Sequence, residues 1–383
     1  MPIYLDNAAT TYPKPLEVYD FMDKFNRTGV FNSGRGNYSQ SSQSSNLVKD
    51  TRNKLLNLFH CSENKYQTVF TPSATIALNT VIMGIDYRKV KNVYITHFEH
   101  NAVLRPLYHL QKIYNFDIIV INLARDILKY CAESVNKQFQ SKKPDVLIMT
   151  HASNVCGLIT PIQTIAKLAK KYDCITITDC SQTAGLVDLN VSESNIDYVV
   201  FAGHKTLYAP FGVAGFIMKK DNMISPLYFG GTGIGSANHD MPLYGESRYE
   251  AGSLNVLSIA GLNASIDWIN KIGIKNIRKK EQHLTQGLKD CIREFSNIKI
   301  VGDNNGGIGV VSCLFSGYSP DNVGQILNKR GMAVRTGLHC APLAHNFLGT
   351  FPSGTVRFSI SYFNTDEDII NLREDLKYIY DNS

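Results

Sequence analysis

The sequence lacks several features that would place a chain of 383 residues in a specialised class. It contains no run of about 18 consecutive apolar residues, so we expect no membrane span. The segment from Met1 to Asp6 has no basic region followed by an apolar run, so we expect no secretory signal. No long Lys/Arg run occurs and the net charge is only +6, so nucleic-acid binding is not expected.

The cysteines and histidines also lack the spacing of a metal or redox motif. None of the eight cysteines forms a C-x-x-C pair, and several lie in apolar, strand-like surroundings. We therefore expect reduced and mostly buried thiols in a cytoplasmic protein. His97 and His100 form an H-x-x-H pair, but no third ligand stands at a suitable spacing, so no metal site is expected.

What the chain does have is a repeated alternation of strand-like and helical segments. Short apolar runs rich in β-branched residues are separated by segments with helical spacing, such as Ile162–Tyr172. The strand-like runs are Thr68–Phe70, Asn92–Thr96, Asp117–Leu123, Asp145–His151, Ile175–Thr178, Tyr198–Ala202 and Val213–Met218. Repeated β-α units predict an α/β fold with a mostly parallel, doubly wound sheet.

The rhythm changes after Ile298, where a strand, a helix and further strands precede a closing helix over Glu367–Tyr380. Thr365 followed by Asp368 is an N-cap signature for that helix. We predict an N-terminal arm (1–15) packing with the small domain, a large domain (16–255) and a smaller C-terminal α/β domain (256–383). Within the large domain, Phe31–Ser45 is expected to be a loop or the start of a helix, and Leu47–Phe59 an amphipathic helix.

Lys205 is the most informative single residue. The segment Ile196–Thr206 begins as a continuous apolar strand and ends in Gly203, His204 and Lys205. Ligands bind at the carboxyl ends of parallel strands, and desolvation there lowers a lysine pKa and frees the amine. The pattern leaves two readings open, a nucleophilic amine and a strand-end lysine that reaches water.

Other strand ends carry what an aldehyde cofactor such as pyridoxal phosphate requires. Asp179 closes a buried strand and could face a ring nitrogen, although an acid there is also a common helix cap. Asn154 and Gln182 could reach a phenolic oxygen, and His100 could cover the ring or be an ordinary loop histidine. Thr71–Asn79 passes from a strand through small hydroxyl residues into a helix, which suits a phosphate or a plain N-cap.

Two further residues stand out in the C-terminal part. Arg357 interrupts an apolar strand pattern, which is typical either of a clamp on a substrate carboxylate or of a structural salt bridge. Cys340 lies in a loop beside His339 and near Arg335, and positive neighbours favour the nucleophilic thiolate. A buried and inert thiol is the alternative.

With these motifs in chain order, the sequence resembles the class V aminotransferase-fold enzymes of the cysteine desulfurase and selenocysteine lyase family. The resemblance covers nearly the whole chain, and the combination of G-H-K with R-T-G-x-H-C-A-P is its most specific part. The matching segments are Tyr4–Ala9, Glu99–His100, Ser153–Val155, Asp179–Gln182, Gly203–Lys205, Arg248–Gly252, Arg335–Cys340 and Val356–Phe358.

The resemblance implies a homodimer of fold type I with pyridoxal 5'-phosphate bound to Lys205. It implies that His100 stacks on the ring, Asp179 faces its nitrogen, and Asn154 and Gln182 face its oxygen. For the remaining site residues it implies phosphate binding by Thr75 and His204, with Ser253 from the partner subunit, and substrate binding by Arg357, Arg335, Asn154 and Arg35. Ala74 stands where the family usually has a hydroxyl residue, so backbone amides or Ser73 are expected to hold more of the phosphate. Thr206 is a further departure.

The implied reaction uses two nucleophiles. Lys205 takes the α-proton of L-cysteine, or of L-selenocysteine, and Cys340 attacks the sulfur to give a persulfide and L-alanine. The persulfide then passes to an acceptor, which could be a scaffold for iron–sulfur cluster assembly, a tRNA-thiolation protein or a small thiol. An ordinary aminotransferase, another Cβ lyase and a non-enzymatic cofactor-binding scaffold are the competing hypotheses.

Overall fold

The computed structural model describes residues 2–33, 36, 38–124, 127–235, 237–303 and 306–382. Its centre is a seven-stranded sheet with the strand order β2-β8-β7-β6-β5-β3-β4. The strands are β2 (Tyr66–Thr71), β3 (Asn92–Ile95), β4 (Asp117–Val120), β5 (Val146–Thr150), β6 (Ile175–Asp179), β7 (Tyr198–Ala202) and β8 (Ala214–Lys219). Strand β8 runs antiparallel to both of its neighbours, β2 and β7, and the other strand pairs described in this sheet are parallel. The predicted α/β fold with a mostly parallel sheet is confirmed.

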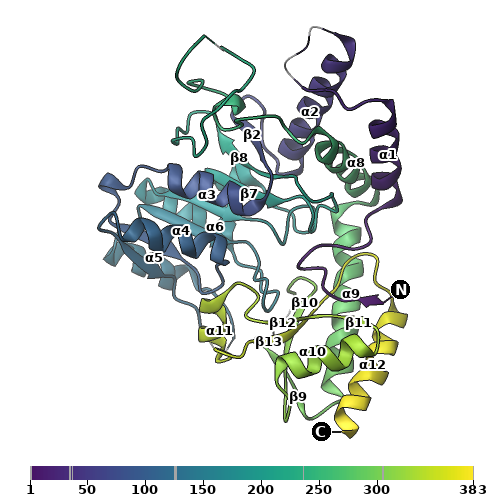
Figure 1. Cartoon of the computed structure of the whole chain (residues 1–383). Coiled ribbons are helices and arrows are strands. Elements are labelled where there is room, and N and C mark those ends of the chain that lie inside the picture. The colour runs from purple at the N-terminus through teal and green to yellow at the C-terminus, as the bar shows by residue number, and fades with distance from the viewer. Residues whose placement is uncertain are drawn as a thin grey trace.

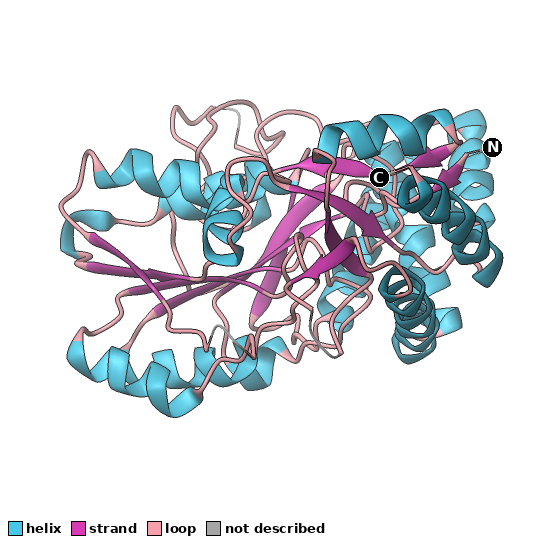
Figure 2. Ribbon diagram, turned by 90° about the horizontal axis from the view of Figure 1, so that it is seen from below, coloured by secondary structure: helices cyan, strands magenta, loops and turns pink. Residues whose placement is uncertain are grey.

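The central strands β5 and β7 are buried along their whole length and almost entirely apolar, because both faces of the sheet are covered (Figures 1 and 2). In β5, Leu147 and Met149 belong to one hydrophobic core, whereas Val146 and Ile148 belong to a second core. The helices of this part are α1 (Leu16–Thr28), α2 (Ser39–Leu58), α3 (Ala74–Gly84), α4 (Asn101–Gln111), α5 (Ala132–Ser141), α6 (Ile162–Ala169), α7 (Val191–Ser194) and α8 (Val256–Ile272). Short 3₁₀ turns lie at Tyr87–Lys89, Lys170–Tyr172 and Glu246–Arg248.

A second, antiparallel sheet of four strands builds the C-terminal part. Its order is β12 (Arg335–Gly337), β13 (Thr355–Ser359), β10 (Val310–Phe315) and β9 (Ile298–Val301). The helices here are α9 (Ile274–Arg293), α10 (Pro320–Lys329), α11 (Pro342–Leu348) and α12 (Asp366–Asp381). Thr365 and Asp368 form the predicted capping box at the start of α12.

The N-terminal arm joins the two sheets. Its strand β1 (Ile3–Tyr4) pairs with β11 (Met332–Ala333) beside the four-stranded sheet. Further along, Thr10 and Thr11 donate hydrogen bonds to carbonyl groups that follow β7 in the large sheet. The arm therefore reaches the end of the strand that carries Lys205.

Some elements differ from the predicted ones. Helix α2 begins at Ser39, so part of the segment expected to be a loop or a helix start is helical. Ser41 and Ser44 are buried there, Ser45 Oγ donates to the Ser41 carbonyl within the helix, and Ser41 Oγ donates to the Asn32 carbonyl before it. Strand β4 ends at Val120, three residues before the predicted end. Among the residues described, no helix is long and apolar enough to cross a membrane.

Candidate active site

A cavity of about 100 Å³ lies at the carboxyl ends of β5, β6 and β7, against the start of α3. Eight of the residues singled out from the sequence line it, although they come from five separate segments. They are Ala74, Thr75, His100, Asn154, Asp179, Gln182, His204 and Lys205. The parallel strands explain this convergence, since their carboxyl ends meet at one edge of the sheet.

Lys205 lies at the base of this cavity, on a turn fixed from two sides. Burial lowers the pKa of its amine from 10.5 to about 8, against the opposing charge of Asp179. The N-terminal arm holds the turn, because Thr11 Oγ1 donates to the Lys205 carbonyl at 3.0 Å and Lys14 Nζ donates to the His204 carbonyl at 2.8 Å. The Lys205 side chain is partly exposed and lines the cavity, which favours the amine of a site over a strand-end lysine that reaches open water.

Asp179 and Gln182 are both held by hydrogen bonds in the wall of the cavity. The carboxylate oxygen Oδ1 of Asp179 accepts hydrogen bonds from the amide and the hydroxyl of Ser181, at 2.9 and 2.5 Å. Gln182 Nε2 donates to the carbonyl of Ala8 in the N-terminal arm at 2.9 Å. These contacts fix the orientation of both side chains before any ligand binds.

His100 is a neutral imidazole of defined tautomer. It is the N-cap of α4, and its Nδ1 accepts a hydrogen bond from the Ala102 amide at 3.0 Å, so the ring hydrogen lies on Nε2. Burial and the nearby Lys205 lower the His100 pKa to about 4.

The sequence reasoning missed the part that Glu99 plays behind His100. Its side chain is fully buried, and Oε1 accepts hydrogen bonds from Thr96 Oγ1 at 2.7 Å and from the Thr150 amide at 2.9 Å. Burial raises the pKa of Glu99 to about 8, so its carboxyl group is mostly protonated at neutral pH. It ties the end of β3 to the end of β5, and in the sequence it stood out only within the matching segment Glu99–His100, with no role assigned.

The start of α3 provides an anion site at the other end of the cavity. Ser73 is the N-cap, and its Oγ accepts a hydrogen bond from the Ile76 amide at 3.3 Å. The amides of Ala74 and Thr75 belong to the first turn, where an α-helix offers no internal acceptor. His204 Nδ1 is buried and has no hydrogen-bond partner among the described residues. These donors fit a phosphate group.

Cys340 lies on a short loop that leads from β12 into α11. Its carbonyl accepts a hydrogen bond from the Asn101 amide at 2.7 Å, which places the loop against the start of α4. Cys340 is half-buried and Cys131 is exposed, whereas the other six thiols are buried. Asn154, which lines the cavity, donates a hydrogen bond to the carbonyl of His339, the residue before Cys340, so the loop of Cys340 lies beside the cavity that holds Lys205.

The expectation that His339 supplies positive charge beside Cys340 is wrong. The His339 ring is buried and lies near Arg357, and these two effects lower its pKa to about 2. Its Nε2 is 2.9 Å from Thr355 Oγ1. Arg335 remains as the cation near the loop.

Arg357 and Arg335 lie directly opposite each other on β13 and β12. Arg357 is 1% exposed, and its Nη2 forms an ion pair with Asp6 Oδ1 at 2.7 Å. The predicted structural salt bridge is thus present, but Arg357 Nε remains buried without a partner among the described residues. Two arginines stand at opposite positions of neighbouring strands, and Asp6 pairs with Arg357 alone, which favours a further anion here. Arg35 lies outside the described residues.

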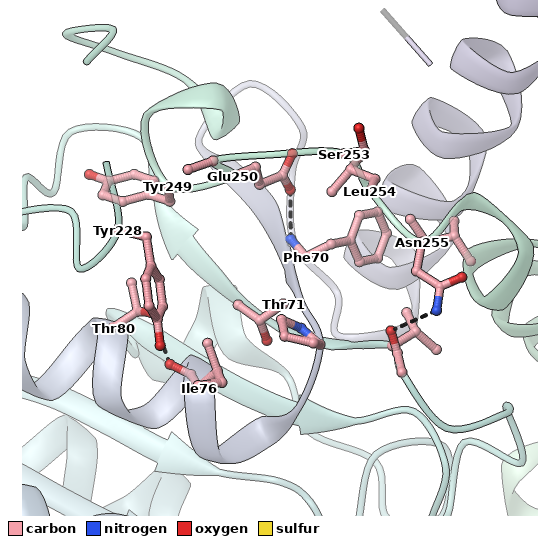
Figure 3. Close-up of a pocket in the computed structure, with 15 residues that line it drawn as sticks. Phe70, Thr71, Ile76, Thr80, Tyr228, Tyr249, Glu250, Ser253, Leu254 and Asn255 are labelled. Atoms are coloured by element: carbon pink, nitrogen blue, oxygen red, sulfur yellow. Dashed lines mark hydrogen bonds between the residues drawn. The ribbon is translucent and has the colours of Figure 1, made fainter. Parts of the chain in front are cut away.

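Among the described residues, Ser253 is the one predicted site residue that lies apart from the cavity at Lys205, the Cys340 loop and the two arginines. It is exposed and borders a second cavity, of about 330 Å³, between β2 and the segment that follows Tyr249 (Figure 3). Glu250 fixes that segment, because it accepts a hydrogen bond from the Phe70 amide at 2.7 Å and forms an ion pair with Arg52 at 2.6 Å. Within one chain, Ser253 therefore has no part in the cavity at Lys205.

The described residues contain no group of three or more His, Cys, Asp or Glu side chains that could hold a metal ion. The cavity instead combines an amine, a buried acid, amide donors and a helix N-terminus. These groups can hold a phosphorylated aldehyde and move protons beside it.

Comparison with known proteins agrees with this arrangement. A probable cysteine desulfurase from Methanothermobacter thermautotrophicus is 29% identical over 384 residues, covering 98% of this chain and 94% of the relative. One from Halalkalibacterium halodurans is 29% identical over 387 residues, covering 98% of this chain and 92% of the relative.

Solved structures give the same result. The apo structure of a cysteine desulfurase from Thermococcus onnurineus NA1 superposes with a TM-score of 0.89 at 26% identity, covering 100% of this chain and 95% of that one. The Escherichia coli cysteine desulfurase CsdA, at 22% identity and a TM-score of 0.85, shares the fold and covers 98% of this chain and 94% of that one. The family described as Aminotransferase class-V matches residues 3–372. The resemblance found in the sequence is confirmed, and the chain belongs to the aminotransferase class-V family.

Proposed function

We propose that the protein is a pyridoxal phosphate-dependent cysteine desulfurase that forms its persulfide on Cys340. The observation that carries this proposal is that the cavity of Lys205 and the loop of Cys340 are joined. Asn154 lines the cavity and donates a hydrogen bond to that loop, and Arg335 and Arg357 lie opposite each other on β12 and β13. An ordinary aminotransferase needs the lysine but has no use for the thiol. The relatives named as cysteine desulfurases support the same assignment.

The residues at the cavity fit the cofactor. Lys205 would hold its aldehyde carbon, Asp179 would face its ring nitrogen, and the amides of Ala74 and Thr75, with His204, would hold its phosphate. His100 would cover the ring, and Asn154 and Gln182 would face its phenolic oxygen. When bound, pyridoxal phosphate supplies an aromatic ring that accepts electrons from the α-carbon of the substrate.

Side chains of the protein bind the substrate, move the proton and accept the sulfur. Arg357, with Arg335, binds the substrate carboxylate. Lys205, whose pKa of about 8 leaves part of the amine neutral at neutral pH, takes the α-proton. The Cys340 thiolate attacks the substrate sulfur, so that an S–S bond forms while the Cβ–S bond breaks and Cβ takes up a proton. L-cysteine and the thiol thus give L-alanine and a persulfide without an external oxidant or reductant.

The experiment measures alanine release from L-cysteine, L-selenocysteine and L-cysteine sulfinate in the presence of a thiol, together with the sulfide, selenide or sulfite that each substrate yields. We expect Cys340→Ala to keep the cofactor absorbance and to lose turnover of L-cysteine. Cys131→Ala is the matched control, because it removes the other thiol that is not buried, at the start of α5. Full desulfuration of L-cysteine by Cys340→Ala would contradict the persulfide role. Turnover restricted to L-selenocysteine would instead indicate a lyase.

We further propose a homodimer in which Ser253 reaches the phosphate site of the partner subunit. Its exposure and its distance from the chain's own cavity support this, as do exposed apolar side chains in the same region, such as Phe229 at 76% and Tyr244 at 74% exposure. Light scattering gives the mass of the assembly, and Ser253→Ala is expected to weaken retention of the cofactor. A monomer that retains the cofactor and turns over L-cysteine would refute it.

The persulfide would pass to an acceptor protein, such as a scaffold for iron–sulfur clusters, or to a small thiol. All eight cysteines are unpaired, which suits a reducing compartment, so we propose a cytoplasmic location.

A further inference from the structure

The loop that carries Cys340 adopts a conformation that its residues disfavour. His339 and Cys340 have φ angles of 47° and 59°, in the left-handed region. A residue with a Cβ loses free energy there, and two in succession persist only when surrounding contacts hold them. Neither is glycine, so contacts must hold the turn. Within the loop the Ala341 amide donates to the Leu338 carbonyl at 2.9 Å, and further constraint comes from outside the loop.

Two hydrogen bonds from other segments provide that constraint. Asn154 Nδ2 donates to the carbonyl oxygen of His339 at 2.7 Å. The backbone amide of Asn101 donates to the carbonyl oxygen of Cys340, also at 2.7 Å. Asn101 is the first residue of α4, where the amide has no acceptor within the helix. Both hydrogen bonds thus end on the carbonyl groups of the two residues with left-handed φ angles.

Asn154 is fixed in turn by the arginine that faces the substrate. Arg357 Nη1 donates to the backbone oxygen of Asn154 at 3.1 Å, while Nη2 pairs with Asp6. The contacts form a continuous path from Asp6 through Arg357 and Asn154 to His339, the residue before the thiol. Asn154 also lines the cavity at Lys205, so this path joins both parts of the site.

We propose that Asn154 is a positioning residue for Cys340, an inference that rests on the proposed function. Its amide holds the left-handed turn at His339 and Cys340 and so keeps the thiol directed toward the cavity. An amide nitrogen carries two hydrogens, so one can hold the loop while the other serves a ligand. Loss of Asn154 then releases the loop even when no substrate is bound, which a role limited to ligand binding does not predict.

The test measures alkylation of the holoenzyme by iodoacetamide without substrate, with the rate at each cysteine read by peptide mass spectrometry. Asn154→Ala is expected to raise the Cys340 rate at least about fivefold, the factor that corresponds to one lost hydrogen bond. Cys131 is exposed and serves as the internal reference. Buried Cys180 and Cys313 report any general unfolding, since they react only when the core opens. An unchanged ratio of the Cys340 rate to the Cys131 rate overturns the proposal.

Two further variants keep the test decisive. Asn154→Asp retains the shape but replaces the donor by an acceptor, so it decides the outcome if Asn154→Ala unfolds. Asn101→Pro removes the second anchor, and proline is favoured at the first position of a helix. His100 already has φ −72° and ψ 155°, a conformation allowed before proline. If Asn101→Pro raises the rate and neither Asn154 variant does, the loop is held without Asn154.

Alkylation needs no turnover, so the two proposals fail separately. A wild-type enzyme that forms no alanine from L-cysteine refutes the proposed function and leaves the alkylation result standing. An active enzyme whose Asn154 variants alkylate like wild type refutes only the positioning role. If the role is correct, both Asn154 variants also lose kcat for L-cysteine by a larger factor than for L-selenocysteine.

Discussion

The ion pair between Asp6 and Arg357 provides the sharpest test of how the N-terminal arm supports the site. Arg357 has 2% of its side-chain surface exposed and Asp6 has 21%, and their atoms are 2.7 Å apart. Removing one partner of a buried pair costs about 3–5 kcal/mol, because the other charge is left without a counter-ion. Since Asp6 is partly exposed, we expect Asp6→Ala to lower the free energy of unfolding by about 3 kcal/mol.

Arg335 increases the effect of losing Asp6. It lies opposite Arg357 across the β12–β13 pair, so the variant leaves two facing cations and no paired carboxylate among the described residues. Asp6→Asn should lose about half as much, because an amide oxygen still accepts a hydrogen bond, although a neutral one is roughly half as strong.

Urea denaturation followed by circular dichroism measures the loss. Asp117→Ala is the matched control. Asp117 forms an ion pair with Lys142, their side chains are 63% and 56% exposed, and such a pair should contribute less than about 1 kcal/mol to stability. A double-mutant cycle with Arg357→Met isolates the pair, and we expect a coupling energy of about 2 kcal/mol. A coupling energy near zero, or an Asp6→Ala loss no larger than that of Asp117→Ala, would refute the reasoning.

Three shorter predictions concern the cavity. The pKa of Lys205 is lowered to about 8. The rate at which pyridoxal phosphate attaches to cofactor-free protein, followed by absorbance, should therefore rise with pH around a midpoint near 8. A midpoint above 10 would contradict this. Ser73→Ala and Ser319→Ala each remove a helix N-cap and should each cost about 1 kcal/mol, but only Ser73→Ala should weaken cofactor binding in a fluorescence titration. Burial raises the pKa of Glu99 in the folded protein from 4.5 to about 8, so its contribution to stability is lost as pH rises from 4.5 to 8. Denaturation should show the free energy of unfolding of Glu99→Gln rising relative to that of wild type over this pH range. A constant difference between the two proteins from pH 5 to pH 8 would contradict the third prediction.

The part of the fold that could be predicted is the part where burial on both faces leaves a continuous apolar pattern. Strand β7 has the predicted bounds Tyr198–Ala202, because all five residues are buried and the first four side chains alternate between two cores. Helix α9 was not predicted, since most of its surface is charged. Its buried residues, among them Ile277, Leu284 and Leu288, follow helical spacing. The apolar pattern of a helix was therefore present, but the Lys and Arg residues between these positions made it hard to recognise.

Site residues at strand ends could be predicted for a similar reason. A polar residue that follows a buried parallel strand must emerge at the same edge as its counterparts, so Asn154, Asp179 and Lys205 were found from local patterns alone. Glu99 was named within a matching segment but given no role, because its importance lies in accepting a hydrogen bond from Thr150, a residue some fifty positions away in the chain. Pairing between distant residues leaves no local pattern in the sequence.

The setting of Cys340 shows how far such pairings decide the chemistry. Local sequence indicated two positive neighbours, His339 and Arg335, and the structure removes the first because burial keeps that imidazole neutral. What holds the thiol instead is backbone geometry, a left-handed turn whose carbonyl groups accept hydrogen bonds from Asn154 and Asn101. The residues that set a nucleophile's reactivity can thus be those that bind its backbone rather than those beside it in the chain. For this enzyme, the rate of sulfur transfer should therefore respond more to changes at Asn154 than to replacement of His339 by a neutral residue that keeps the hydrogen bond to Thr355.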